Sequence, residues 1–122
     1  MVEVYPDGKY LPFTAGADIT AGQIVELSGD RTVVPAGDGS TKVIGVALIN
    51  AKSGEKVTVV TEGVVDVIAA GAVSAGDRVQ SAAEGKVAKW TASAAGDSAK
   101  IIGTALTSAS ADGDKISVKL TL

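Results

Sequence analysis

The side chains that could do chemistry in this chain are mainly carboxylates, because its 122 residues include no histidine and no cysteine. Without these residue types, neither a Ser-His-Asp nor a Cys-His nucleophile can be built, and the usual zinc ligands are missing. The absence of cysteine also excludes a disulfide framework. The chemistry left open is acid–base catalysis by a pair of carboxylates, or binding of a hard cation such as calcium.

The positions of the carboxylates favour a structural role. Most adjoin a glycine in a short polar stretch, where such side chains stabilise turns. The stretch Asp112-Gly113-Asp114 is similar to part of a calcium loop, but an EF-hand needs more ligands and a terminal glutamate. Asp66 lies inside an apolar stretch, and we expect it to face solvent or a partner. With no nucleotide-binding glycine motif either, the sequence predicts a protein that is not an enzyme and has no cofactor or metal.

Trp90 is the one large aromatic residue beyond residue 16. It could stack on a sugar ring, which would make the chain a ligand- or carbohydrate-binding surface module. A tryptophan in an aromatic-poor domain is more often an anchor in the core or at a subunit interface, and we favour that role. An exposed Trp90 beside a concave apolar pocket would favour the carbohydrate module instead.

Charge and hydropathy exclude further classes of partner. The net charge is −3 and the basic residues are scattered, whereas nucleic-acid binding needs a clustered basic face. The longest apolar stretch, residues 64–73, contains Asp66 and Gly71 and is too short to span a bilayer. No secretory signal is visible at the amino terminus. We therefore expect a soluble protein made inside the cell, without nucleic-acid or membrane partners.

Short β-strands must position these side chains. The apolar residues are mainly valine, alanine and isoleucine, which suit pleated sheets. Alternating stretches separated by glycine, aspartate and serine turns predict an all-β fold, a small antiparallel β-sandwich or barrel. Gly63 is expected to end one strand before the next begins. The expected strands are residues 23–27, 31–34, 43–48, 57–61, 64–68, 78–81, 87–90, 101–106 and 116–120.

The chain contains the same pattern twice. The stretch 42–60 recurs from Lys100 onward, with Lys, Ile-Gly, Ala-Leu and a later Gly-acid-Lys in the same order. An Ala-Gly turn precedes each copy, at Gly22 and at Gly76. Two copies are too few for a solenoid, so the pattern indicates two related β units in one domain. The units cover about residues 17–70 and 71–122.

The duplication predicts specific strand pairs. We expect strand 43–48 to pair with 57–61, and strand 101–106 to pair with 116–120, in matching antiparallel arrangements. A glycine inside each strand, Gly45 in one copy and Gly103 in the other, indicates close approach of a neighbouring backbone.

Residues 1–16 differ from the repeated part. They hold three of the four aromatic residues and two of the three prolines, namely Tyr5, Pro6, Tyr10, Pro12 and Phe13. One interpretation is an amino-terminal barrel strand whose aromatic rings fill the core. The sharper hypothesis is an extended arm, separate from a single β domain at 17–122, that docks on another chain. In that case these five residues and Trp90 contact a partner.

The ordered set of motifs resembles a family of tailed-phage capsid cement, or decoration, proteins. The resemblance rests on Ile-Thr-Ala-Gly-Gln-Ile-Val at 19–25, Val-Ile-Gly-Val-Ala-Leu at 43–48 and the stretch Gly-Glu-Lys-Val-Thr-Val-Val-Thr-Glu-Gly-Val-Val at 54–65. Val-Ser-Ala-Gly-Asp-Arg-Val at 73–79 completes it. The match covers most of the chain from about residue 17 to residue 120, and residues 1–16 are the least covered.

The resemblance implies a small β-rich protein on the outer surface of an icosahedral phage head. It implies binding to assembled major capsid protein, commonly as a homotrimer at local three-fold positions, and stabilisation of the shell by bridging capsomers. The family has no catalytic residues to carry over.

Overall fold

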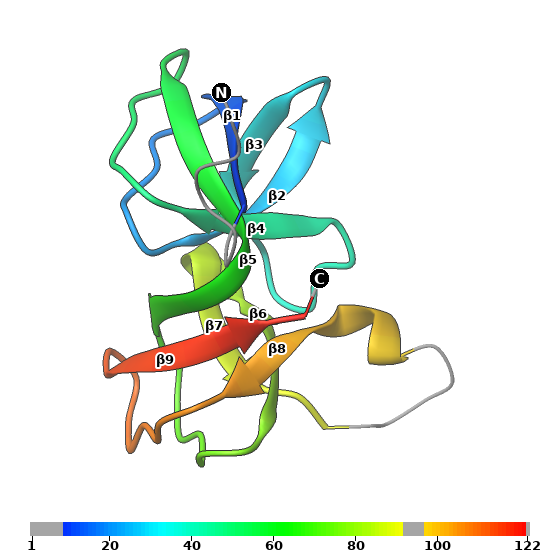
Figure 1. Cartoon of the computed structure of the whole chain (residues 1–122), viewed down its shortest axis with the longest axis vertical. Coiled ribbons are helices and arrows are strands. Elements are labelled where there is room, and N and C mark those ends of the chain that lie inside the picture. Colours follow the sequence, from blue (N-terminus) through cyan, green and yellow to red (C-terminus); the bar gives the residue numbers. More distant parts are fainter. Residues whose placement is uncertain (1–8, 92–96, 122) are drawn as a thin grey trace.

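The structure, a computed structural model, describes residues 9–91 and 97–121 and consists almost entirely of β-strands (Figure 1). The prediction of an all-β fold is confirmed. Within the described residues, no helix is long and apolar enough to cross a membrane. The elements are β1 (Lys9–Ala15), β2 (Ile24–Gly29), β3 (Thr32–Pro35), β4 (Val43–Ala47), β5 (Lys56–Ile68), β6 (Arg78–Ala82), β7 (Lys86–Lys89), β8 (Ile101–Ala105), β9 (Lys115–Leu120) and two short helical turns, η1 (Ala83–Gly85) and η2 (Asp97–Lys100).

The first five strands close into a small barrel in the upper part of Figure 1. Neighbouring strands follow the order β1–β3–β2–β4–β5, and β1 also pairs with β5, so the sheet closes on itself. In β5, Val57 and Val59 are buried while Thr58 between them is only half-buried. This period of two is typical of a strand with one face toward a core.

Strand β5 belongs to both halves of the molecule (Figure 1). Its first part pairs with β1 and β4, and its last part, from Gly63 to Ile68, pairs with β9. The prediction that Gly63 ends a strand is wrong, because β5 continues through it. Gly63 has a φ of 104°, a backbone conformation that residues with a β-carbon rarely adopt. This conformation lets β5 pass from one half of the molecule into the other.

The lower half of the molecule repeats the upper one. Beyond Gly63, strands β9, β8, β6 and β7 follow β5 in that order, and a parallel bridge between Ala69 and Val87 joins the two ends. We call residues 9–62 the first unit and residues 63–121 the second unit. The last part of β5 occupies in the second unit the place that β1 occupies in the first, so the units meet inside β5 and not near residue 70.

The hydrogen-bonded pairs of the two units match. β4 pairs with β5 and β8 pairs with β9, both antiparallel, as the repeated sequence predicts. The bridge between Ile19 and Ala51 recurs as the bridge between Val73 and Ala109. The duplication seen in the sequence is therefore also present in the strand pairing.

Each unit has its own apolar core. The core of the first unit contains Phe13, Ala15, Ile19, Val25, Val33, Ala47, Ala51, Val57 and Val59, with Ile44 packed against them. The core of the second unit contains the matching residues Val67, Ala69, Val73, Val79, Val87, Ala105, Ala109, Ile116 and Val118, with Ile102 in the place of Ile44. Ile24, Ala36 and Val46 of the first unit join this second core, so the two units are packed against each other.

The amino-terminal segment is a barrel strand as far as the structure describes it. β1 pairs with β5 from Lys9 to Thr14, and Phe13 is only 5% exposed. For residues 9–15 this corrects the expectation of an extended arm, because the first barrel needs β1 to close. The same pairing uses the backbone groups that an arm would offer to the sheet edge of another protein. Residues 1–8 lie outside the described residues.

Candidate interaction surface

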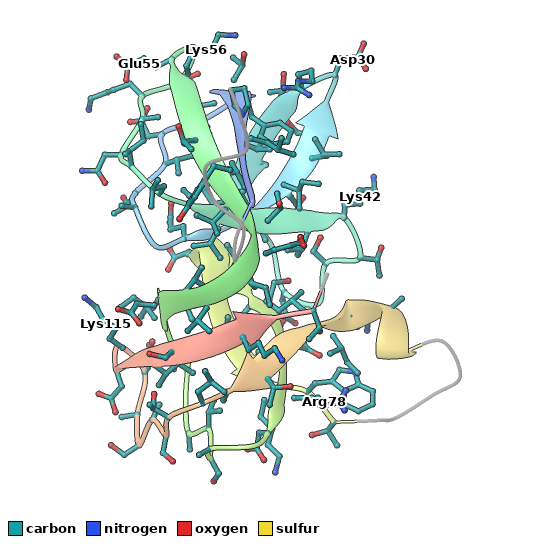
Figure 2. All side chains as sticks on the ribbon, viewed as in Figure 1. Asp30, Lys42, Glu55, Lys56, Arg78 and Lys115 are labelled. Atoms are coloured by element: carbon teal, nitrogen blue, oxygen red, sulfur yellow. The ribbon has the colours of Figure 1, made fainter. Side chains whose placement is uncertain are left out.

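Several carboxylates of the described chain hold turns in place. Asp77 accepts a hydrogen bond from the backbone N–H of Ser74 at 2.9 Å, and Glu55 accepts one from Lys52 at 2.8 Å. In Figure 2, Glu55 and Lys56 lie at the tip of the turn before β5, and Lys115 lies at the matching turn before β9. The structural role predicted for turn carboxylates is thus seen in both units.

Two carboxylates near the start of β9 resemble part of a calcium loop in sequence, but both have other partners. Asp114 accepts hydrogen bonds from the backbone N–H groups of Ser110, at 2.8 Å, and Ala111, at 3.2 Å. These bonds lower the pKa of Asp114, the bond from Ser110 most strongly. Asp112 pairs with Lys86 at 3.0 Å, and this hydrogen bond raises the pKa of the lysine. In the described part of the chain, no group of three or more possible metal-ligating residues converges.

Asp66, the acid inside an apolar stretch, points outward from β5. Its side chain is exposed and accepts a hydrogen bond from the hydroxyl of Ser117 on β9 at 2.9 Å. This geometry is typical of a cross-strand pair on a sheet surface.

The side chain of Phe13 is buried, not exposed on the surface. Its ring lies in the core of the first unit, and the guanidinium of Arg31 lies over it, 5.1 Å from the ring centroid. The Nη2 atom of Arg31 also donates to the carbonyl oxygen of Pro12 at 2.8 Å. Arg31 therefore covers the buried ring from the outside.

The other expected contact residues lie in different places. Tyr10 and Pro12 are exposed on β1, on the surface of the first unit. Trp90 follows β7 in the second unit, is half-buried, and donates its backbone N–H to the carbonyl oxygen of Arg78 at 2.8 Å. Tyr5 and Pro6 lie outside the described residues. The described members thus occupy two separate units and do not form one site.

A shallow depression on the first unit is lined mainly by polar residues, and several of their side chains accept hydrogen bonds. Asn50 accepts from Ala21 N–H at 2.7 Å, and Asp18 accepts from Ser53 N–H at 3.0 Å. The carbohydrate-module interpretation requires an apolar hollow beside an exposed Trp90. This depression is of a different kind, and Trp90 is half-buried.

Exposed aliphatic residues are the surface feature that the sequence analysis missed. Leu48 is 50% exposed after β4, and Leu106 is 46% exposed at the matching position after β8. Their backbone N–H groups donate to the carbonyl oxygens of Thr58 and Ser117, both at 2.8 Å, so the two units hold them alike. The recurrence of Ala-Leu in both copies was the available signal. The other exposed large apolar residues of the described chain are Tyr10, Leu11, Leu27, Ile49 and Val64.

Comparison with known proteins gives this surface a context. The sequence model of the phage cement protein family matches residues 5–120. No curated protein matches the chain. Among solved structures, the fold is similar to the N base of head fiber gp8.5 of bacteriophage phi29, with a TM-score of 0.71 and 17% identity over 93% of this chain and 94% of that chain. Because the family model covers nearly its whole length, the chain belongs to the phage cement protein family and has a structural role at the phage capsid.

Proposed function

We propose that the chain binds the outer surface of an assembled phage capsid, contacts the major capsid protein and stabilises the shell by bridging neighbouring capsomers. It acts as a homotrimer and catalyses no reaction. The observation that carries the proposal is the family match over residues 5–120. The use of Asp77, Asp114 and Glu55 as turn acceptors supports the non-enzymatic part.

The duplicated leucines support the bridging role. Leu48 and Leu106 are both about half exposed and are held by the same backbone hydrogen bond in each unit. The chain therefore presents the same exposed leucine twice, once in each unit. A capsid is a lattice of identical subunits, so two equal contacts on one chain suit two equal surfaces on neighbouring subunits. Tyr10, Pro12 and Trp90 are further proposed contacts.

Stabilisation of the assembled shell follows from mass action. A protein that binds the assembled shell but not the separated subunits shifts the equilibrium toward the shell, by about 2.7 kcal/mol per site at a free concentration one hundred times the Kd. Two linked contacts add avidity, because the second binds at the high effective concentration set by the first.

Co-sedimentation with empty, expanded capsids tests the proposal, and Leu48→Asp, Leu106→Asp and the double variant test the contact. Each single variant keeps one of the two leucine contacts, so we expect it to bind capsids more weakly than wild type. The double variant should no longer sediment with capsids. Wild-type protein that stays in the supernatant would contradict capsid binding. A folded double variant that sediments like wild type would leave capsid binding intact and reject the two leucines as its contacts.

A further inference from the structure

One row of paired residues differs in chemistry between the two units. In the first unit the row crosses β1, β5, β4 and β2 and consists of Tyr10, Val60, Val46 and Ile24. In the second unit the same pairings cross β5, β9, β8 and β6 and give a row of Val64, Lys119, Thr104 and Arg78. Because directly paired residues of antiparallel strands share a face, each row is a continuous strip on one side of its sheet.

The row of the first unit is covered inside the molecule. Ile24, Val46 and Val60 are each at most 7% exposed. Ile24 and Val46 belong to the core of the second unit, so this strip forms part of the contact between the two units.

The row of the second unit reaches solvent instead. Arg78 and Lys119 are exposed, and Thr104, between them, is half-buried. Neighbouring strands lie about 4.8 Å apart, so the backbones of the two cationic residues lie about 10 Å apart, with the hydroxyl-bearing residue between them. Within the described part of the chain, neither Arg78 nor Lys119 forms an ion pair. Two unpaired cations and a hydroxyl thus replace three buried aliphatic side chains.

Exposed apolar residues lie on the same face as these cations. Val64, paired with Lys119, is 59% exposed. Leu106 follows Thr104 by two residues, which places both side chains on the same side of the strand. Its backbone N–H donates to the carbonyl oxygen of Ser117, so Leu106 continues the pairing of β8 with β9. A partner that covers Leu106 therefore also reaches the row of cations.

The two cations define the chemistry that such a partner needs. A cation taken out of water without an anion beside it opposes binding. Carboxylates opposite Arg78 and Lys119 remove this penalty, and an arginine can hold both oxygens of one carboxylate. The carboxylate of this face, Asp66 in the neighbouring row, already accepts a hydrogen bond from Ser117 at 2.9 Å. The face is therefore complementary to an acidic surface that has an apolar site beside it.

We propose that Arg78, Thr104 and Lys119 bind carboxylates of an acidic segment of the major capsid protein, beside the apolar site that receives Leu106. This inference rests on the proposed function, because it names the chemistry of the capsid surface that the second unit contacts. The exposed leucine is common to both units, whereas the cationic row belongs to the second unit alone.

Co-sedimentation with empty, expanded, nuclease-treated heads over a series of salt concentrations tests the proposal. At low salt, Arg78→Gln and Lys119→Gln should each weaken binding by about fivefold or more, because each removes one charge-assisted contact. This loss of affinity should shrink as the salt concentration is raised from about 0.05 M to about 1 M, because salt screens the attraction between charges. Melting curves establish that each variant is folded.

Two control variants separate charge from shape. Lys42→Gln also removes an exposed positive charge, but on the first unit (Figure 2) and at the opposite end of β4 from Leu48, so it should bind like wild type. Leu106→Ala removes apolar surface from the same face as Arg78. Its loss of affinity should not shrink at high salt, because burial of apolar surface is not screened.

The proposal is wrong if Arg78→Gln and Lys119→Gln bind heads like wild type at low salt, or if their loss of affinity is the same at every salt concentration. Both results leave capsid binding itself intact. Wild-type protein that never sediments with heads would contradict the proposed function and this inference together.

Two further results would assign the cationic row to another partner and also reject the proposal. Wild-type protein that binds untreated heads but not nuclease-treated heads would identify nucleic acid as the anionic partner. A change in the oligomeric state of the purified chain, seen by sedimentation of the two charge variants without heads, would assign the row to a contact between copies.

Discussion

Gly45 lies so close to Val60 that a β-carbon at position 45 would overlap the Val60 carbonyl oxygen and lie 2.8 Å from Val59 Cγ1. The second unit repeats this relationship between Gly103 and Lys119, where a β-carbon would also lie 2.9 Å from Val118 Cγ1. The close approach predicted from the two strand glycines is confirmed in both units. Glycine is required here because the neighbouring strand leaves no room for a side chain.

Gly45→Ala and Gly103→Ala should therefore each destabilise the fold, by about 1–3 kcal/mol, since a backbone shift is needed to relieve the overlap. Chemical denaturation measures the loss. Gly37→Ala is the matched control, because a β-carbon there meets nothing within 4 Å. Equal losses at positions 37 and 45 would contradict the packing of β4 against β5.

Phe13→Ala should destabilise the chain by about 3–5 kcal/mol, because the ring is buried in the first core and its removal leaves a cavity. Tyr10→Ala, on the same strand but 37% exposed, should cost much less. Urea unfolding of both variants checks this. A folded Phe13→Ala variant with wild-type stability would mean that β1 is dispensable and that the segment acts as an arm.

Ser81→Ala should weaken the contact between the two units, because it leaves the Ser40 N–H and the Gly37 carbonyl oxygen without their buried partner. The expected cost is about 1–3 kcal/mol. Ser117→Ala removes a more exposed hydroxyl, bonded to Asp66, and should cost less than about 1 kcal/mol. Hydrogen exchange of the Ser40 amide should accelerate only in the Ser81 variant; unchanged exchange would contradict the assignment.

Asp114→Asn should remove a pH-dependent part of the stability. The folded-state pKa of Asp114 lies below its ordinary value of 3.8, so its contribution is complete above that value and is lost as the pH falls through the folded-state pKa. The stability difference between wild type and variant should shrink between neutral pH and about pH 3. A constant difference across this range would contradict the role of the Ser110 and Ala111 hydrogen bonds.

The sequence predicted the strands and their duplication well, because valine alternation and turn glycines are local signals. It misjudged β1 and β5 for a shared reason. Pro12 and Gly63 both disfavour a regular strand locally, whereas closure of the first barrel and pairing with β9 are long-range interactions that override this preference. The solvent exposure of individual side chains could not be predicted from the sequence either. The Ala-Leu repeat is visible in the sequence, but it is the packing of the strands that leaves Leu48 and Leu106 exposed and buries Phe13.

In the proposed function, this chain lies on the outside of the phage shell and joins neighbouring capsomers. Cryo-electron microscopy of expanded heads incubated with the purified chain tests it most directly. We expect density for both units on the outer surface, with Leu48 and Leu106 facing different copies of the major capsid protein. Density confined to the inner surface or standing on a single capsid subunit, or bare heads at saturating protein, would contradict the account.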